Sequence, residues 1–126
     1  MKILVIEDEP ASRKLAGLVL TAGGHSVADA GSAEKAIDAI AESQPEIILL
    51  DLGLPGMDGF ALARKLKQDS KTSHIPIVAI TSYPDRFSRE DAFRANCDAY
   101  LVKPIDTRKL ARQVEAIAGR TSSGTK

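Results

Sequence analysis

The strongest constraint on the fold of this chain is a set of five short apolar runs, separated by longer segments of helical character. Three of the runs are continuous and rich in branched residues, namely residues 3–6, 47–50 and 77–80. Continuous apolar runs of this length are typical of strands that are buried on both faces of a parallel sheet. A weaker run lies at residues 26–28, and residues 100–102 form the last one.

The segments between these runs have the apolar spacing of amphipathic helices. The first expected helix begins at Pro10 and ends before Gly23. Its apolar positions are Ala11, Leu15, Leu18, Val19 and Ala22. Ser32 is expected to cap the second helix and Asp58 the third, because short oxygen-bearing side chains accept hydrogen bonds from the first turn. The fourth helix is expected to be short and to begin near Ser88.

Strand and helix therefore alternate five times along the chain, and right-handed crossovers then place helices on both faces of one sheet. The sequence predicts an α/β fold, a doubly wound five-stranded parallel sheet with five helices. A length of 126 residues suits one domain. We expect this domain to cover residues 1–119, with the last helix ending at Gly119, and residues 120–126 to form a polar, disordered tail.

Composition narrows the possible partners and the compartment. Lys plus Arg and Asp plus Glu both number 17, so no net charge favours nucleic acid or an anionic membrane as a direct partner. Cys97 is the single cysteine, which excludes an internal disulfide and fits a small buried side chain in a reducing compartment. No apolar segment is long enough to span a bilayer, and the first residues lack the pattern of a signal peptide. We expect a cytoplasmic protein.

Polar side chains follow four of the predicted strands at the point where each strand ends. Glu7 and Asp8 follow the first strand, Asp51 the third, Thr81 the fourth and Lys103 the fifth. The carboxyl ends of parallel strands share one edge of the sheet, which is where such folds bind ligands. Two carboxylates 4 Å apart repel by about 4 kcal/mol at an effective dielectric near 20. Such a cluster holds a proton, pairs with a lysine or binds a cation.

The chemistry of this set suits a metal-assisted phosphoryl transfer. Carboxylate oxygens without histidine or cysteine favour Mg²⁺, or Mn²⁺, over softer metals. The candidate ligands are Glu7, Asp8, Asp51 and a backbone carbonyl at Gly53. An aspartate is also a possible nucleophile that forms an aspartyl phosphate, and Lys103 would neutralise charge on the transferring oxygens.

Four motifs in this order resemble the receiver domain of response regulators in bacterial two-component signalling. They are Glu7-Asp8, the segment from Asp51 to Gly59, Thr81-Ser82, and the run from Tyr100 through Lys103-Pro104. The resemblance extends from about Lys2 to about Gly119. Each motif alone is weak, but all four stand at the ends of the expected strands.

The resemblance implies a role for each matching residue. Asp51 is similar to the phosphoacceptor that receives the phosphoryl group from a sensor histidine kinase or a histidine phosphotransfer protein. Glu7, Asp8 and Asp51 resemble the Mg²⁺ ligands of the family, and Lys103 resembles the lysine that contacts the phosphoryl group. The domain would then be a phosphoacceptor switch rather than a turnover enzyme.

The resemblance also implies how such a switch signals. Thr81 resembles the hydroxyl that moves towards the phosphoryl group, and Tyr100 resembles the aromatic residue that turns inward with it. The fourth helix, fifth strand and fifth helix would form the face that a downstream protein target recognises, through a shift between two conformations. We expect a stand-alone regulator or a relay intermediate that acts by protein contact, and a domain of a longer regulator is the open alternative.

Three alternative functions fit this sequence less well. An aspartate-nucleophile phosphatase needs a second aspartate two residues after the first, where this chain has Gly53. A flavodoxin-like flavin protein needs a phosphate loop after the first strand, where residues 7–9 would repel a phosphate. The nearest rival is a phosphorylation-independent, receiver-like binding module, which would have lost the acidic cluster or the lysine.

A few residues were assigned no part in the chemistry. His25 and His74 are interpreted as surface residues, since neither has partner ligands at metal spacing. Asn96 stands where the family usually has glycine, and asparagine tolerates a left-handed backbone better than most residues. Phe87 is interpreted as either a core residue or a partner-facing one.

Overall fold

The computed structural model has one five-stranded parallel sheet with the strand order β2-β1-β3-β4-β5. It describes the backbone of residues 1–124 and the side chains of residues 1–120. The strands are β1 (Lys2–Ile6), β2 (Ser26–Ala30), β3 (Ile47–Asp51), β4 (Ile77–Thr81) and β5 (Ala99–Val102). The helices are α1 (Pro10–Ala22), α2 (Ala33–Glu42), α3 (Gly59–Gln68), α4 (Arg89–Arg94) and α5 (Leu110–Gly124). The predicted fold class is confirmed.

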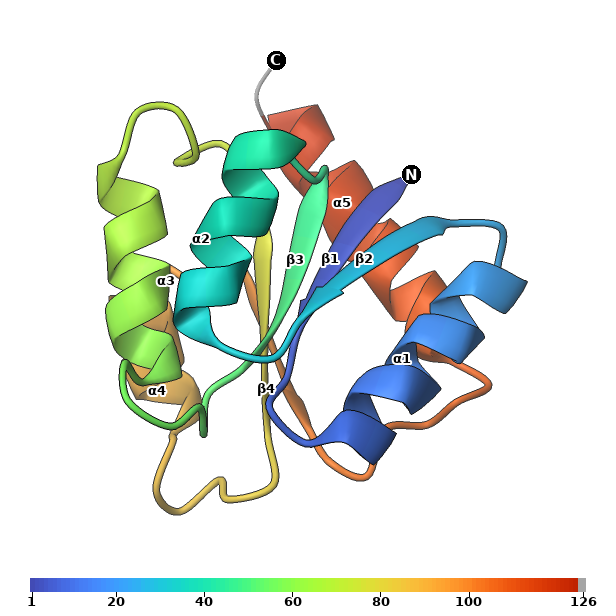
Figure 1. Cartoon of the computed structure of the whole chain (residues 1–126), viewed down its shortest axis with the longest axis horizontal. Helices are drawn as coiled ribbons and strands as arrows, with labels where there is room; N and C mark the ends of the chain where they lie inside the picture. Colours follow the sequence, from blue (N-terminus) through green and yellow to red (C-terminus); the bar gives the residue numbers. More distant parts are fainter. Residues whose placement is uncertain (125–126) are drawn as a thin grey trace.

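The helices cover both faces of the sheet, α1 and α5 on one side and α2, α3 and α4 on the other (Figure 1). Alternate residues of β1 point to these two layers. Ile3 and Val5 pack in the core beneath α1 and α5. Leu4 and Ile6 pack in the core beneath the other three helices. This arrangement explains the continuous apolar runs, because a central strand is buried on both faces and leaves no position for a polar side chain.

Each of the first four helices begins at a residue that caps it. The Glu9 carboxylate accepts hydrogen bonds from the N–H groups of Ala11 and Ser12 at the start of α1. Ser32, Asp58 and Ser88 each accept one from the first turn of α2, α3 and α4. The predicted caps are confirmed, as is the short fourth helix.

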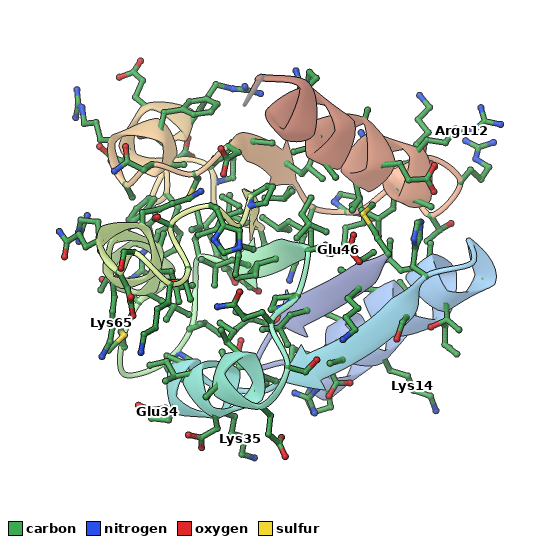
Figure 2. The ribbon with its side chains drawn as sticks, turned by 90° about the horizontal axis from the view of Figure 1, so that it is seen from above. Lys14, Glu34, Lys35, Glu46, Lys65 and Arg112 are labelled. Atoms are coloured by element: carbon green, nitrogen blue, oxygen red, sulfur yellow. The ribbon has the colours of Figure 1, made fainter. Side chains whose placement is uncertain are left out.

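Charged side chains such as those of Lys14, Lys35, Lys65 and Arg112 project away from the sheet (Figure 2).

The apolar face predicted for α1 is wrong in part. Leu15 and Leu18 are 48% and 60% exposed, while the buried residues of this helix are Ala16 and Leu20. Both sets repeat at three or four residues, so helical spacing alone does not select between two adjacent apolar stripes. The contact with the sheet selects the narrower stripe and leaves two leucines in solvent.

The last helix continues further than its sequence predicts. α5 runs to Gly124, whereas Gly119 was expected to end it. Gly119 does not adopt the left-handed backbone that makes glycine a helix terminator, so the helical hydrogen bonding passes through it. The end of the predicted tail, residues 125–126, lies outside the described residues. β2 is also longer than expected, because it extends to Ala30 alongside β1.

His25 is not the surface residue that was predicted, whereas His74 is exposed as expected. The His25 side chain is only 9% exposed, and its Nε2 lies 2.7 Å from a carboxylate oxygen of Glu115 on α5. Its Nδ1 lies 3.1 Å from the amino group of Met1. This histidine therefore joins the start of β2 to α5. Within the part of the chain that the structure describes, no helix has the length and apolar character needed to cross a membrane.

Candidate functional site: carboxylates and a lysine at one sheet edge

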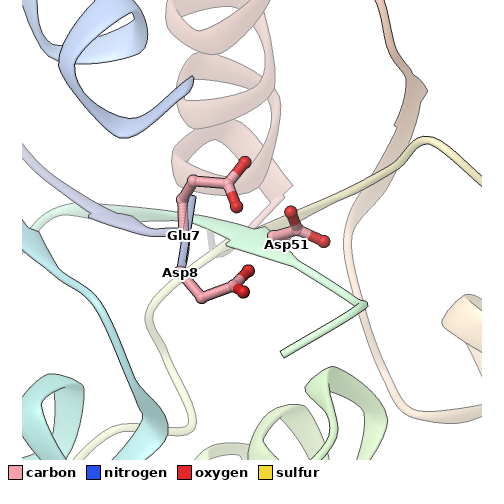
Figure 3. Close-up of side chains that lie close together, drawn as sticks. All are labelled: Glu7, Asp8 and Asp51. Carbon is pink, nitrogen blue, oxygen red and sulfur yellow. The ribbon is translucent and has the colours of Figure 1, made fainter. Parts of the chain in front are cut away.

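The ends of β1 and β3 bring three carboxylates together. The two strands are neighbours, and Ile6 pairs with Leu50, so the residues that follow lie side by side. Figure 3 shows Glu7 and Asp8 at the end of β1 beside Asp51 at the end of β3. One carboxylate oxygen from each residue lies within 4.8 Å of the others. The predicted grouping of Glu7, Asp8 and Asp51 is therefore present.

Lys103 reaches this cluster from the segment that follows β5. Its Nζ lies 2.9 Å from Oδ2 of Asp51 and also donates a hydrogen bond to Oε1 of Glu7. The lysine backbone N–H donates to the carbonyl of Thr81 at 2.8 Å, which fixes the side chain at this edge. One ammonium group thus pairs with two of the three clustered carboxylates, and Asp8 has no such partner among the described ion pairs.

Burial and pairing set the protonation states of the cluster. Burial raises the pKa of Glu7 to about 7, and the shared hydrogen bond with Asp51 adds to this effect. Burial would also raise the pKa of Asp51, but hydrogen bonds with Glu7, Lys103 and the Gly53 N–H outweigh it and lower that pKa. Burial disfavours the charged Lys103, yet its bonds to Glu7 and Asp51 raise its pKa overall. Of this pair, Asp51 is therefore the carboxylate that stays ionised, and Glu7 is the one that exchanges a proton in the neutral pH range.

The loop after β3 holds the Asp51 side chain in place. The Gly53 N–H donates to Oδ1 of Asp51 at 2.8 Å. Gly59, at the first turn of α3, packs so closely that a Cβ there would lie 2.5 Å from the Cα of Leu52. Gly56 adopts a left-handed backbone with φ of 74°. The turn glycines of the sequence motif thus let the loop fold back tightly beside Asp51.

The two predicted switch residues lie close by without joining the carboxylates. Thr81 is fully buried at the end of β4, and its hydroxyl oxygen accepts a hydrogen bond from the Tyr83 N–H at 2.9 Å. Tyr100 is 8% exposed and points inward, and its hydroxyl donates to the backbone carbonyl of Phe87. Both side chains are therefore bonded to the segment between β4 and α4.

Two contacts at the site have no counterpart in the sequence reasoning. Arg13, on the first turns of α1, donates to the backbone carbonyl of Glu7 at 2.9 Å and so helps to hold the backbone of the acidic pair in place. Phe87 lies with its ring next to Gly53 and its carbonyl on Tyr100. An arginine and a phenylalanine in polar or amphipathic segments give no local signal of such contacts, since each depends on the folded backbone.

A sequence model described as "Response regulator receiver domain" matches residues 3–115 of the chain. The chain belongs to this family. Receiver domains are phosphoacceptor signalling switches that bind Mg²⁺ through an acidic cluster and work with histidine kinases or phosphotransfer proteins. The carboxylate cluster of this receiver domain stands at the same sheet edge at which doubly wound folds bind their ligands.

Relatives and solved structures agree with this membership. The chain is 40% identical over 116 residues to "Response regulator PleD" of Caulobacter vibrioides, covering 92% of this chain and 26% of that protein. It is 33% identical over 122 residues to "Phosphate regulon transcriptional regulatory protein PhoB" of Pseudomonas aeruginosa, covering 97% of this chain and 53% of that protein. The chain thus spans about half or less of the length of these curated relatives.

The structural neighbours have the same fold over nearly the whole chain. NtrX from Brucella abortus matches with a TM-score of 0.90 at 27% identity, covering 98% of this chain and 28% of that one. A CheY-like response regulator receiver domain protein from Methanospirillum hungatei matches with a TM-score of 0.88, covering 98% of this chain and 97% of that one. At 23% identity, the second match supports the fold alone.

Proposed function

We propose that this receiver domain takes a phosphoryl group onto Asp51 from a sensor histidine kinase or a histidine phosphotransfer protein. The observation that carries the proposal is the position of Lys103, whose ammonium group bonds both Asp51 and Glu7 beside the open carboxylate of Asp8. This arrangement pairs an ionised, oriented carboxylate with a cation that is placed for the oxygens of an incoming phosphoryl group.

The carboxylate cluster fits the Mg²⁺ that receiver domains use. Its three side chains offer oxygen ligands only, at a spacing that one hard cation accepts, and Mn²⁺ suits the same donors. Glu7, Asp8, Asp51 and the backbone carbonyl of Gly53 would hold the ion. A bound cation supplies positive charge that offsets the charge of the phosphoryl oxygens.

The transfer itself follows from the state of Asp51. Its carboxylate is ionised, so an oxygen forms the new bond to phosphorus while the bond from phosphorus to the donor's imidazole nitrogen breaks. The imidazole nitrogen keeps the electron pair and takes up a proton. The Gly53 N–H fixes Asp51 through Oδ1, and Lys103 stays charged because its pKa is raised. The chain catalyses only this transfer and the later hydrolysis of its own aspartyl phosphate.

The donor would reach Asp51 from the side of α1. A hollow opens there beside Lys103, lined by Ser12, Leu15, Ser82, Lys103, Pro104 and Ile105. The exposed Leu15 and Leu18 lie along the same helix and offer apolar contacts to a donor protein. The output would come from the other side, where the phosphoryl group draws Thr81 from its bond with Tyr83 and changes the α4-β5-α5 face that a downstream protein target recognises.

The test is phosphorylation by acetyl phosphate in the presence and absence of Mg²⁺, followed by intact-mass measurement. We expect one added phosphoryl group that requires Mg²⁺ and is absent from Asp51→Asn. Asp58→Asn is the matched control, because Asp58 only caps α3 and asparagine is an equally good cap. The control should accept the phosphoryl group normally. If the unmodified protein gains no mass and binds neither Mg²⁺ nor beryllofluoride, the phosphorylation-independent binding module becomes the better account.

A further inference from the structure

Phe87, in the segment between β4 and α4, makes contacts on both its ring and its backbone. Its ring packs against Phe60 of α3, with centroids 5.7 Å apart and planes inclined by 58°. One ring carbon, Cε2, lies 3.9 Å from the position that a Cβ at Gly53 would occupy. Its backbone carbonyl accepts the hydroxyl of Tyr100. Phe87 thus faces the loop beside Asp51 at one end and bonds the inward tyrosine at the other.

The ring contact reaches the group that orients Asp51. Gly53 is the residue whose N–H is bonded to the Asp51 carboxylate. A change of charge or size at Asp51 alters the strength and geometry of its hydrogen bond with the Gly53 N–H. The position of the Gly53 backbone should change with it. Because the Phe87 ring packs against Phe60 and one of its carbons faces the Cβ position of Gly53, the ring is in a position to respond to the state of Asp51.

The backbone contact makes the orientation of Tyr100 depend on Phe87. A buried tyrosine hydroxyl needs a hydrogen-bond partner, and here that partner is the Phe87 carbonyl. The Phe87 N–H donates to the carbonyl of Tyr83 at 2.9 Å, and this bond closes a turn over residues 83–87. We expect the carbonyl and the ring of Phe87 to move together with this turn. If the ring leaves Gly53, the acceptor for Tyr100 leaves with it.

Thr81, the predicted switch hydroxyl, is connected to the same turn by hydrogen bonds. The Thr81 hydroxyl oxygen accepts from the Tyr83 N–H, and the Tyr83 carbonyl accepts from the N–H of Phe87. One route therefore runs from Asp51 through Gly53 to the ring of Phe87, and a second runs from Thr81 through Tyr83 to its backbone. The two routes meet at Phe87 before they reach Tyr100.

We propose that Phe87 is a positioning residue that couples the state of Asp51 to the inward orientation of Tyr100, through its ring on Gly53 and its carbonyl on the tyrosine hydroxyl. This coupling rests on the proposed function, in which Asp51 is the phosphoacceptor. Coupling of this kind is reciprocal, so removing the Tyr100 hydroxyl must weaken the binding of a phosphoryl mimic at Asp51.

The first test is a double-mutant cycle on the affinity for beryllofluoride with Mg²⁺, using ¹⁹F NMR to observe the bound mimic. We expect Tyr100→Phe to weaken binding about fivefold in the unmodified background, which is a typical coupling, and to change it less than twofold in Phe87→Ala. Phe93→Ala is the matched control, because Phe93 is a 43% exposed aromatic residue on α4 that packs beneath Arg89 rather than against the site. In that control the fivefold effect of Tyr100→Phe should remain.

The second test follows Tyr100 itself. The chain has two tyrosines and no tryptophan, so Tyr83→Phe leaves Tyr100 as the single fluorescent reporter. Because Tyr100 is already inward and 8% exposed, acrylamide quenching should be low in this reference protein with or without beryllofluoride, and adding Phe87→Ala should raise it severalfold. Phe87→Leu keeps an apolar contact and should restore part of the protection, which separates positioning from a failure to fold.

The outcomes distinguish this inference from the function on which it rests. If Phe87→Ala binds beryllofluoride and keeps the full effect of Tyr100→Phe, the coupling role of Phe87 is overturned while the phosphoacceptor function stands. The same conclusion follows if Phe87→Ala is unfolded and Phe87→Leu shows an unaltered cycle and unaltered quenching of Tyr100. If the unmodified protein does not bind the mimic at all, the proposed function fails first and the inference fails with it.

Discussion

The interiors of the central strands are fully buried and the carboxyl edge of the sheet is buried only in part, and burial has opposite effects in the two regions. Leu50 is fully buried and the next residue is Asp51; Ile6 is fully buried and the next residue is Glu7, which is 5% exposed. Burying a leucine or isoleucine stabilises a fold by about 1.5–3 kcal/mol. Burying a carboxylate is unfavourable, and burial raises the pKa of Glu7 even though Lys103 bonds to it. One step along a strand separates a stabilising residue from a costly one.

This comparison explains how the domain tolerates its site. The two apolar cores on either side of the sheet provide the free energy of folding, and the edge uses part of it to hold like charges together. In the proposed function, this cluster is arranged for a cation and a phosphoryl group before either binds. Substitutions in the two regions should separate these contributions.

The largest effect is expected from the strand interior. Leu50→Ala should lower the free energy of unfolding by about 3 kcal/mol or more, because it removes apolar contacts and leaves a cavity between the sheet and the helices. Urea denaturation measures this loss. Leu18→Ala, at a 60% exposed position of α1, should change it by less than about 0.5 kcal/mol. Equal losses in the two variants would contradict the assignment of the core.

The loop that carries the site should be nearly as sensitive. Gly59→Ala places a Cβ 2.5 Å from the Cα of Leu52, a backbone atom that has no freedom to move aside. We expect a loss of about 2 kcal/mol in thermal or urea denaturation, since overpacking of this kind costs about 1–3 kcal/mol. Gly119→Ala is the control, because no atom lies within 4 Å of its Cβ position and alanine favours a helix by about 1 kcal/mol over glycine. A gain at residue 119 and a loss at residue 59 are expected.

At the carboxyl edge, by contrast, a substitution should raise the stability of the fold, because it removes the charge of a buried carboxylate. The pKa of Glu7 rises from an ordinary 4.5 to about 7 in the fold, so the native state binds the proton more tightly than the unfolded state. The stabilising contribution of this proton is complete below pH 4.5 and is lost as the pH rises through 7. Without divalent cations, the protein should therefore lose stability between pH 5 and pH 8. Glu7→Gln mimics the protonated side chain and should remove this loss, so that it exceeds the unmodified protein by about 1 kcal/mol at pH 8.

An effect no larger than this is expected outside both regions. Asn96, after α4, has a left-handed backbone with φ of 68°. Glycine adopts this conformation freely, so Asn96→Gly should be neutral or slightly stabilising, whereas Asn96→Ala should cost about 1 kcal/mol. Chemical denaturation of the pair compares them directly. A more stable alanine variant would show that the strain at this position is relieved in solution.

The sequence predicted those parts of the molecule whose signal is local. The continuous runs around Leu50 identified the central strands, since burial on both faces leaves only apolar residues. The same runs also placed Glu7, Asp51 and Lys103 at a common edge, because a strand end is visible where an apolar run stops. The grouping of these residues could be predicted because parallel strands end at the same edge of a sheet. No feature of the sequence indicated a contact between any two of them.

The parts that were missed depend on contacts between distant segments. Leu15 and Leu20 both fit the helical spacing of α1, and only its packing against the sheet decides that Leu20 is buried and Leu15 is not. His25 and Glu115 are 90 residues apart, and nothing near either residue indicates their hydrogen bond. The sequence does not decide whether Phe87 is a core or a partner-facing residue, because Gly53 and Tyr100 come near it only in the folded chain.

The central claim is that the carboxylate edge is held under mutual repulsion until a divalent cation binds. Thermal denaturation at pH 8 with increasing Mg²⁺ tests it most directly, in the unmodified protein, Asp51→Asn and Asp58→Asn. At ten times the dissociation constant, Mg²⁺ should stabilise the unmodified protein and Asp58→Asn by about 1.4 kcal/mol, and Asp51→Asn much less. An equal rise in the melting temperature of all three proteins, or no rise in any of them, would contradict the account.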